Sequence, residues 1–331
     1  MSGALRILAR TRDGIVAEVE IASPRVDPSA VFIGRTPEEA AALAGRLFSL
    51  CPMAQSTATR AATGLPPQDN ETLALLCERL AEMLRASLLD WPGATPAPED
   101  IAALREILPL LRRLPDEAST AAAEALRAAL SRLGLGVEQG VFAREKAEAQ
   151  ADESAMNLRA RRADFLTPDD DLAVIEALWA HKTFSRAPAL LGRRVETGLA
   201  ARRNLAQGAL AARIAAREAE MIETAAAIEI LLQGGSAPKD LVARGFGFAA
   251  VESARGRLYH ACRLDACRRI SDYRIVAPTE WNFHPDGPFA RLAVGANIGA
   301  GAQAKRRVER LAFVFDPCIK AEAEITELAH A

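Results

Sequence analysis

A stripe of leucines between residues 70 and 89 constrains the fold more than any other feature of the sequence. It consists of Leu73, Leu76, Leu80, Leu84 and Leu88, at spacings of three and four residues. This spacing places the leucines on one face of an α-helix. Cys77 lies beside the stripe, and a lone buried cysteine usually behaves as a small apolar residue. The pattern therefore predicts a helix that packs into a hydrophobic core, with Cys77 as part of that core.

Further helices are indicated on both sides of this one. Thr36 precedes Pro37 and two glutamates, which is typical of a helix start. This helix is expected to run to about Leu50 and to stop at Cys51, because the residue before a proline disfavours the helical conformation. The other predicted helices cover residues 98–113, 116–134, 167–181, 199–232 and 303–311. The charged, alanine-rich stretch 143–164 fits either a solvated helix or a connector, with its charges on a wet face.

Strand patterns lie near both ends of the chain. Apolar and acidic residues alternate in 5–22 around the turn pair Asp13–Gly14, which predicts a hairpin. A second hairpin is predicted over 256–263 and 268–277, and prolines then return the chain to loop. The expected fold class is α+β, mainly α: a helical bundle with small β-hairpins near both termini. We expect one domain, 1–331, made of an N-terminal hairpin and cysteine motif (1–60), a helical bundle (70–235) and a C-terminal hairpin and cysteine motif (245–331).

The composition excludes several classes of protein. The 41 basic and 43 acidic residues give a net charge of -2, so the basic footprint of a nucleic-acid-binding protein is absent. Aromatic residues make up 5%, too few for an obvious base-stacking platform. No apolar run approaches the roughly 18 residues that a membrane helix needs, and no basic segment with an apolar core opens the chain. We therefore expect a cytoplasmic protein that binds neither nucleic acid nor membrane.

Two of the five cysteines stand beside prolines at opposite ends of the chain. Cys51 precedes Pro52 and Cys318 follows Pro317, each next to a predicted helix end. The cysteines form no CxxC pair, which argues against a disulfide framework and against a structural zinc site. Two thiolates brought together could bind a soft transition metal, and helix ends or a nearby arginine would favour the thiolate. Spacing alone leaves open that Cys51 and Cys318 are unrelated thiols.

Five segments, in order, resemble the large subunit of nickel–iron hydrogenases. They are residues 46–54, 196–202, 252–256, 276–282 and 315–318, which resemble the family's R-x-C-G-x-C-P-x-A, E-T-G-P-L-A-R, E-x-P-R-G, V-V-P-T-T-W-N and F-D-P-C motifs. The last three lie within residues 252–318, which as a whole resemble the C-terminal part of that subunit. The resemblance implies that Cys51 and Cys318 meet in space, together with Arg255, which in the family sits over the diatomic ligands of the iron.

The departures from the family concern its metal ligands. Phe48 stands at the first cysteine of the N-terminal motif, and Ala321 at the second cysteine of the C-terminal one. Gln55 and Glu324 replace histidines, and Ala254 replaces a proline. With two thiolates instead of four, the chain is not expected to hold the nickel–iron pair or to turn over hydrogen. Whether Asp13 replaces the carboxylate of the family's T-R-I-E-G motif stays open, because the alignment has a gap there.

The remaining residues resemble the pattern of the HupK/HoxV-type hydrogenase formation proteins. This resemblance implies a maturation scaffold, not an enzyme, which holds an Fe(CN)2(CO) fragment on Cys51 and Cys318, without nickel, for transfer to the apo large subunit. Arg255 would donate a hydrogen bond to cyanide. The implied partners are HypC/HypD-type maturation proteins, a HypC-like chaperone and the apo large subunit.

Cys51 matches a bridging cysteine of the family and Cys318 a terminal nickel ligand. Cys318 must therefore turn toward the iron, or a partner protein must supply the second thiolate. The alternative function is a metal-free interaction protein that mimics the large subunit to control hydrogenase assembly.

Several other residues near these motifs have plainer interpretations. Arg255 could pair with Asp316, which before a proline is also a turn residue. Trp281 and Asn282 are expected to pack and to pin loops, and His260 and His284 to satisfy local hydrogen bonds. Cys262 and Cys267 could face each other across the second hairpin.

Overall fold

The computed structural model describes residues 3–24, 27–117, 119–158, 163–205, 208–236, 238 and 241–329. The helices of this part are α1 Pro37–Leu47, α2 Pro52–Ala62, α3 Glu71–Leu89, α4 Pro98–Arg113, α5 Thr120–Arg132, α6 Val141–Met156, α7 Asp171–Ala180, α8 Leu199–Arg202, α9 Leu210–Leu232, α10 Pro278–Asn282, α11 Pro288–Ala293 and α12 Gly301–Phe313. The strands are β1 Leu5–Arg12, β2 Ile15–Ala22, β3 Asp164–Phe165, β4 Val195–Glu196, β5 Val242–Gly245, β6 Phe248–Ser253, β7 Gly256–Leu264, β8 Ile270–Val276 and β9 Ala321–Glu327.

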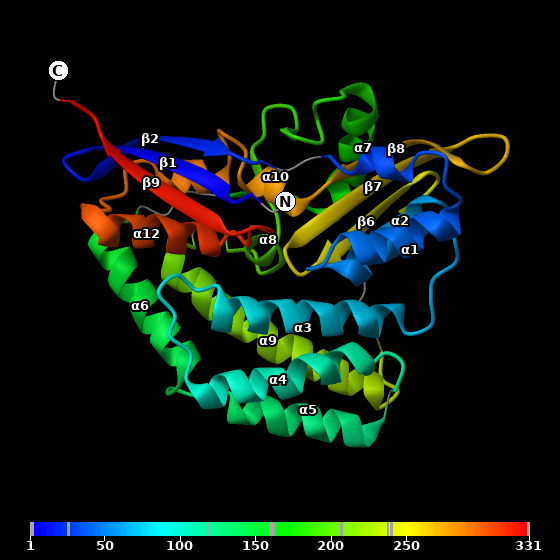
Figure 1. Ribbon diagram of the computed structural model, residues 1–331, viewed down its shortest axis with the longest axis horizontal. Helices are drawn as coiled ribbons and strands as arrows, with labels where there is room; N and C mark the ends of the chain where they lie inside the picture. The colour runs from blue at the N-terminus through cyan, green and yellow to red at the C-terminus, as the bar shows by residue number, and fades with distance from the viewer. Residues whose placement is uncertain are drawn as a thin grey trace.

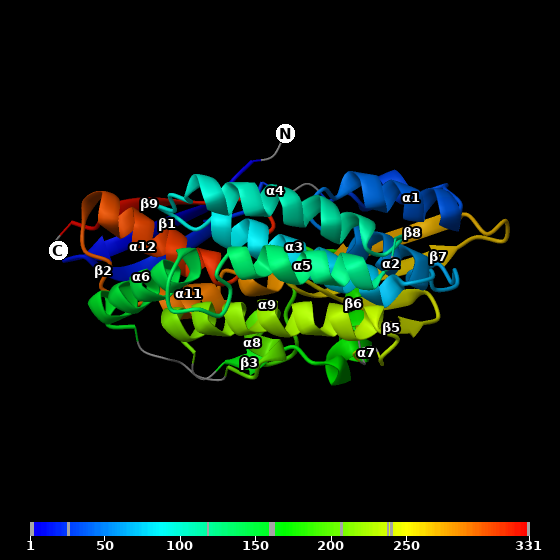
Figure 2. The same cartoon turned by 90° about the horizontal axis from the view of Figure 1, so that it is seen from below.

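The leucine helix α3 lies within a layer of long helices. It packs against α4 and α9, and α5 packs against α4 and α9. Leu80, Leu84 and Leu88 are fully buried, and Cys77 lies in the same core, as predicted. Figure 1 shows this layer below the two main sheets, with α4 and α5 on the side away from them, and Figure 2 shows the layer from below. Among the described helices, none has the length and apolar character to cross a bilayer.

Two sheets lie above the helical layer (Figure 1). One has the strand order β2-β1-β9, with β9 parallel to β1 and Leu5 opposite Ala321. The other is antiparallel with the order β5-β6-β7-β8, and α2 packs on β6 and β7. The predicted fold class, α+β and mainly α with strands near both ends, is confirmed. The pairing of β1 with β9 brings the N-terminal and C-terminal strands together, and both strands begin beside the loop that carries Cys318.

The predicted helix from Thr36 ends earlier than expected. Thr36 caps α1 in a capping box with Glu39, but α1 ends at Leu47. Cys51 is not at a helix exit: it is the N-cap residue of a second helix, α2, which the sequence analysis missed. Pro52 occupies the first position of α2, where its fixed φ angle suits a helix and its missing N–H costs nothing. Pro52 was interpreted only as the end of the first helix, whereas it is the first residue of the next one.

The other differences concern connections. The predicted helix over 199–232 is two helices, α8 and α9, and Asn204 has a left-handed φ of 50° after α8. The predicted C-terminal hairpin is confirmed as β7 and β8, but it belongs to a four-stranded sheet, and β9 was not foreseen. Residues 118, 159–162, 206–207, 237 and 239–240, which fall in or beside predicted helices, lie outside the described residues.

The charged stretch after residue 143 forms α6, and its charges are not simply on a wet face. Glu145 and Asp152 are buried. Asp152 binds Arg307 and Arg310 of α12, and Glu148 accepts a hydrogen bond from the indole of Trp91. These ion pairs attach α6 to α12, so the interpretation of the charge run as a solvated face was wrong.

Candidate functional site

One cleft of about 810 Å³ is lined by all three residues that the sequence singled out, Cys51, Arg255 and Cys318. A neighbouring hollow of about 510 Å³ also reaches Arg255 and Cys318. All five cysteines are thiols rather than disulfides. The structure therefore brings together two thiols and a guanidinium from opposite ends of the chain, as the resemblance implied.

Cys51 is fixed by the start of α2. The first N–H groups of a helix have no partner within the helix. Here the carboxylate of Glu78, on α3, accepts hydrogen bonds from the backbone N–H of Met53 and of Ala54, the latter at 3.0 Å. A negative group at this position also complements the positive end of the helix. Sequence reasoning missed Glu78, because nothing local connects α3 with residues 51–54.

Desolvation favours the protonated form of the Cys51 thiol. Burial, followed by the nearby charge of Glu78, raises the pKa of Cys51 to about 12. Arg255 and a hydrogen bond from Gln55 Nε2 to the sulfur, at 3.7 Å, lower the pKa by less. The expectation that the helix end and Arg255 favour a thiolate was therefore wrong: desolvation outweighs both. Burial also raises the pKa of Glu78 to about 7.

Arg255 lies in the turn between β6 and β7, and 7% of it is exposed. Its Nη2 donates to Glu82 Oε2 at 2.8 Å, so its partner is a residue of α3 and not Asp316, as one interpretation had it. Burial alone would lower the pKa of Arg255, but the carboxylates of Glu82 and Asp316 raise it, and the group stays charged. Its Nη1 is buried and has no hydrogen-bond partner among the described residues.

The loop that carries Cys318 is held by hydrogen bonds from other motif segments. The backbone N–H of Cys318 donates to Thr279 Oγ1 at 3.2 Å. Asn282 Nδ2 donates to the carbonyls of Phe315 and Thr197, both at 3.1 Å, and its Oδ1 accepts from Thr197 N at 3.0 Å. The predicted pinning role of Asn282 is confirmed, and Trp281 packs edge-on against Phe184.

Close backbone contact explains the glycines of two of these motifs. Gly198 follows Thr197 with a φ of 99°, and Gly256 follows Arg255 with a φ of 131°. A Cβ atom at Gly198 would lie 2.5 Å from the carbonyl oxygen of Arg255. The two backbones can therefore meet only without side chains at these positions. This close contact fixes the Arg255 turn against residues 197–198.

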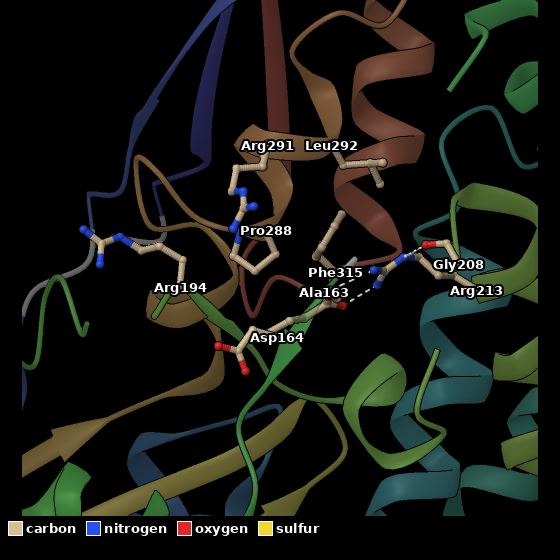
Figure 3. A pocket seen from close by; sticks show the side chains of 10 residues that line it. Ala163, Asp164, Arg194, Gly208, Arg213, Pro288, Arg291, Leu292 and Phe315 are labelled. Atoms are coloured by element: carbon tan, nitrogen blue, oxygen red, sulfur yellow. Dashed lines mark hydrogen bonds and ion pairs between the residues drawn. The ribbon is translucent and has the colours of Figure 1, made fainter. Parts of the chain in front are cut away.

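A buried ion pair between Arg213 and Glu196 packs against the loop that carries Cys318. Figure 3 shows Arg213 of α9 with its guanidinium directed toward Phe315, and its carboxylate partner is Glu196, which precedes Thr197. Both side chains are buried and bonded in a bidentate pair. The guanidinium of Arg213 also lies over the ring of Phe315, 4.4 Å from its centre. The adjoining cavity, which Arg194 and Arg291 also line, holds only about 30 Å³, so this region is a packed support rather than a ligand pocket.

His260, His284, Cys262 and Cys267 are not among the residues that line the cleft. His260 is buried between Gln55, at 2.9 Å from Nε2, and Tyr273, at 2.7 Å from Nδ1. His284 Nδ1 accepts the backbone N–H of Asp286. These local hydrogen bonds were expected. Cys262 and Cys267 do not face each other, because Cys262 is buried in β7 opposite Tyr273 whereas Cys267 is exposed in the turn.

The structure also shows where three positions that bear on the departures from the hydrogenase pattern lie: Phe48, Ala321 and Asp13. Phe48 lines the cleft next to Cys51, and Ala321 begins β9. Asp13 lies in the β1–β2 turn, where its N–H donates to Glu327 at 2.7 Å. Ala4 lines the cleft, but Asp13 is at the other end of β1, on the order of 30 Å away at about 3.3 Å per residue. Asp13 therefore does not place a carboxylate in the cleft.

The fold is that of a nickel–iron hydrogenase large subunit. Solved structures with this fold include the Ni-Fe-Se hydrogenase of Desulfovibrio vulgaris Hildenborough, with a TM-score of 0.63 and 16% identity over 94% of this chain and 95% of that one. The Ni-Fe-Se hydrogenase of Desulfomicrobium baculatum has a TM-score of 0.62 over 94% and 96% of the two chains, again at 16% identity. At this identity the likeness shows the fold.

Sequence comparison identifies the family. The chain is 39% identical to the hydrogenase expression/formation protein HupK of Rhizobium leguminosarum bv. viciae, over 91% of this chain and 90% of that protein. It is 33% identical to HupK of Bradyrhizobium diazoefficiens over 96% and 95% of the two chains, and 28% identical to HoxV of Cupriavidus necator over 89% of each. The search found no family model that matches. The chain belongs to the HupK family of hydrogenase expression/formation proteins.

Proposed function

We propose that this protein acts in hydrogenase maturation as a scaffold that holds an Fe(CN)2(CO) fragment and passes it to the apo large subunit. Cys51 and Cys318 bind the iron through their sulfur atoms, and Arg255 donates a hydrogen bond to a cyanide nitrogen. HypC/HypD-type proteins and a HypC-like chaperone supply the fragment. The names of the relatives support the maturation role, and the large-subunit fold supports a cleft suited to the same iron unit.

One observation carries this proposal: Arg255 is buried in the thiol-lined cleft with Nη1 unsatisfied by the described residues. A buried donor without a partner costs about 1–3 kcal/mol, and more when it is charged. A cyanide ligand is an anionic acceptor that would remove this cost with a charge-assisted hydrogen bond. The ion pair with Glu82 leaves Nη1 available for such a ligand.

The count of sulfur donors fits iron that already carries three strong ligands. Among the described residues, no group of three or more His, Cys, Asp or Glu side chains is arranged to hold a metal ion. Phe48 and Ala321 offer no donor, so the cleft supplies two thiols. Two thiolates and three diatomic ligands leave one position of an octahedral iron open, and an open position suits transfer. Nickel is not part of this proposal, and neither is hydrogen turnover.

Binding must displace the proton of Cys51. Since burial raises the pKa of this thiol to about 12, the sulfur carries its proton until the metal replaces it. Loading therefore releases protons, and acid favours release of the cargo. This property suits a site that holds a metal fragment transiently.

Variants of Arg255 test the role of the guanidinium. The protein is purified anaerobically from a host that expresses hydrogenase maturation genes, and its infrared spectrum is recorded with Arg255→Gln and Arg255→Lys. We expect Arg255→Gln to shift the cyanide bands and to lower the iron content, and Arg255→Lys to do so less. Arg203→Gln, which removes the partner of the exposed Glu223, is the control.

Two results would count against the scaffold. Cyanide bands that are identical in wild type and Arg255→Gln would remove Arg255 from the site. A wild-type protein that co-purifies with its partners but contains no iron would favour the metal-free assembly factor.

A further inference from the structure

Helix α9 presents two arginines, one turn apart, to the loop that leads to Cys318. Arg213 and Arg217 are both 3% exposed. Arg213 lies over the ring of Phe315, and the guanidinium of Arg217 lies 4.8 Å from the ring centre of Phe313. The carboxylate partner of Arg213 is Glu196, which lies outside the loop. The carboxylate partner of Arg217 is Asp316, which belongs to the loop itself.

The contacts of Arg217 join three elements. Its Nη1 donates to Asp316 Oδ1 at 2.6 Å, and its Nε donates to Ser87 Oγ of α3 at 3.0 Å. Arg217 thus ties α9 and α3 to the residue that precedes Pro317 and Cys318. Because all of these side chains are buried or nearly so, the ion pair is only weakly screened by solvent.

Asp316 is under backbone strain and electrostatic competition. Its φ is 51°, a left-handed conformation that costs energy for residues other than glycine, least for Asn and Asp. The charge of Asp316 also acts on Arg255 and on Arg202. In the absence of Arg217, the carboxylate of Asp316 is attracted to Arg255 instead. A reorientation of Asp316 toward Arg255 would rotate Pro317 and Cys318.

We propose that Arg217 is a positioning residue for Cys318. Its ion pair with Asp316 sets the direction in which the 316–318 loop leaves α12, and thereby keeps the Cys318 sulfur within the cleft that Cys51 lines. This inference deepens the proposed function, on which its consequence for the iron fragment rests. The positioning itself is a property of the cargo-free protein.

The first test therefore uses no cargo. The native protein is treated with iodoacetamide, and the rates at Cys318, Cys51 and Cys77 are followed by mass spectrometry in wild type, Arg217→Lys, Arg217→Met and Asp316→Asn. Asn tolerates the left-handed conformation, so Asp316→Asn removes the charge with little backbone cost. Arg203→Met is the control. Its partner Glu223 lies on α9, the helix that carries Arg217, but is exposed.

We expect the ratio of the Cys318 rate to the Cys51 rate to change roughly tenfold in Arg217→Met, as when a loop gains a local opening motion. The change should be smaller in Arg217→Lys and Asp316→Asn and absent in the control. Cys77 is buried in the core of α3 and reports global unfolding. A ratio that stays at the wild-type value in all three variants, with Cys77 protected, would overturn the inference, and so would a parallel rise at Cys51 and Cys77.

The second test adds the fragment. In protein loaded by the maturation proteins, Arg217→Met should broaden or shift the carbonyl band and lower iron retention, whereas Arg217→Lys should restore part of it. Wild-type protein without a fragment would refute the proposed function and leave the alkylation result to decide the role of Arg217. Unchanged bands and iron content in Arg217→Met would contradict the positioning role.

Discussion

The two halves of the cleft are built by different means. Cys51 stands at the start of a regular helix, α2. Glu78 accepts hydrogen bonds from its first N–H groups, and the helix packs on β6 and β7. Cys318 stands in a loop held by side chains from distant elements, among them Thr279, Asn282 and Arg217. Regular structure fixes the first thiol, whereas single polar contacts fix the second. The Cys318 half should therefore respond more strongly to single substitutions.

The largest expected effect lies in the Cys51 half and concerns reactivity. With a pKa raised to about 12 by burial and Glu78, the thiolate fraction at pH 8 is roughly a thousandfold below that of an ordinary thiol. We expect iodoacetamide to modify Cys51 of the cargo-free protein at least that much more slowly than N-acetylcysteine, with a rate that keeps rising above pH 10. A rate that levels off near pH 9 would mean that the Cys51 environment is not desolvated.

The second-largest expected effect concerns the ion pair between Glu196 and Arg213, which packs against the Cys318 loop. Glu196→Gln leaves the guanidinium of Arg213 buried without its carboxylate, which typically costs about 3–5 kcal/mol. Chemical denaturation should show this loss, and the double variant Glu196→Leu, Arg213→Met should recover much of it. Glu223→Gln breaks an exposed pair and should cost at most about 1 kcal/mol. Equal losses in Glu196→Gln and Glu223→Gln would show that the buried pair is not a support.

The smallest effect depends on pH and lies beside Arg217. Burial raises the pKa of Glu145 to about 8, with Arg217 as the main opposing influence. The native carboxyl therefore keeps its proton to a higher pH than the unfolded chain does. The stability that this contributes is complete below about pH 4.5 and is lost as the pH rises to about 8.

Glu145→Gln cannot lose that contribution. Its stability relative to wild type should rise by about 1 kcal/mol or more between pH 5 and pH 8, measured by urea denaturation at both values. A difference that does not change with pH would place Glu145 in a more solvated environment than the structure gives it.

What could be predicted from the sequence follows the same division. Local patterns identified α3, the β1–β2 hairpin and the β7–β8 hairpin, because periodicity and turn residues report short-range structure. They missed β9, whose partner β1 lies at the other end of the chain. They also missed α2, because Pro52 is compatible both with the end of one helix and with the start of the next.

The site shows where local reasoning ends. The resemblance indicated Cys51, Arg255 and Cys318, and the structure places them in one cleft, while their roles as ligands stay predictions. Glu78 and Glu82 were not foreseen, because polar residues opposite a leucine stripe are normally expected to face solvent. Arg217 gave no signal either, since its partner lies 99 residues further along the chain.

The most direct test of the scaffold is an infrared spectrum of the anaerobically purified protein, from a host with the hydrogenase maturation genes, beside Cys51→Ser and Cys318→Ser. The account predicts paired cyanide bands and one carbonyl band in wild type, with the bands lost in both variants. Loss in Cys51→Ser alone would assign the second thiolate to a partner. Wild-type protein that carries its partners but shows no such bands would contradict the scaffold and leave the large-subunit fold as an assembly surface.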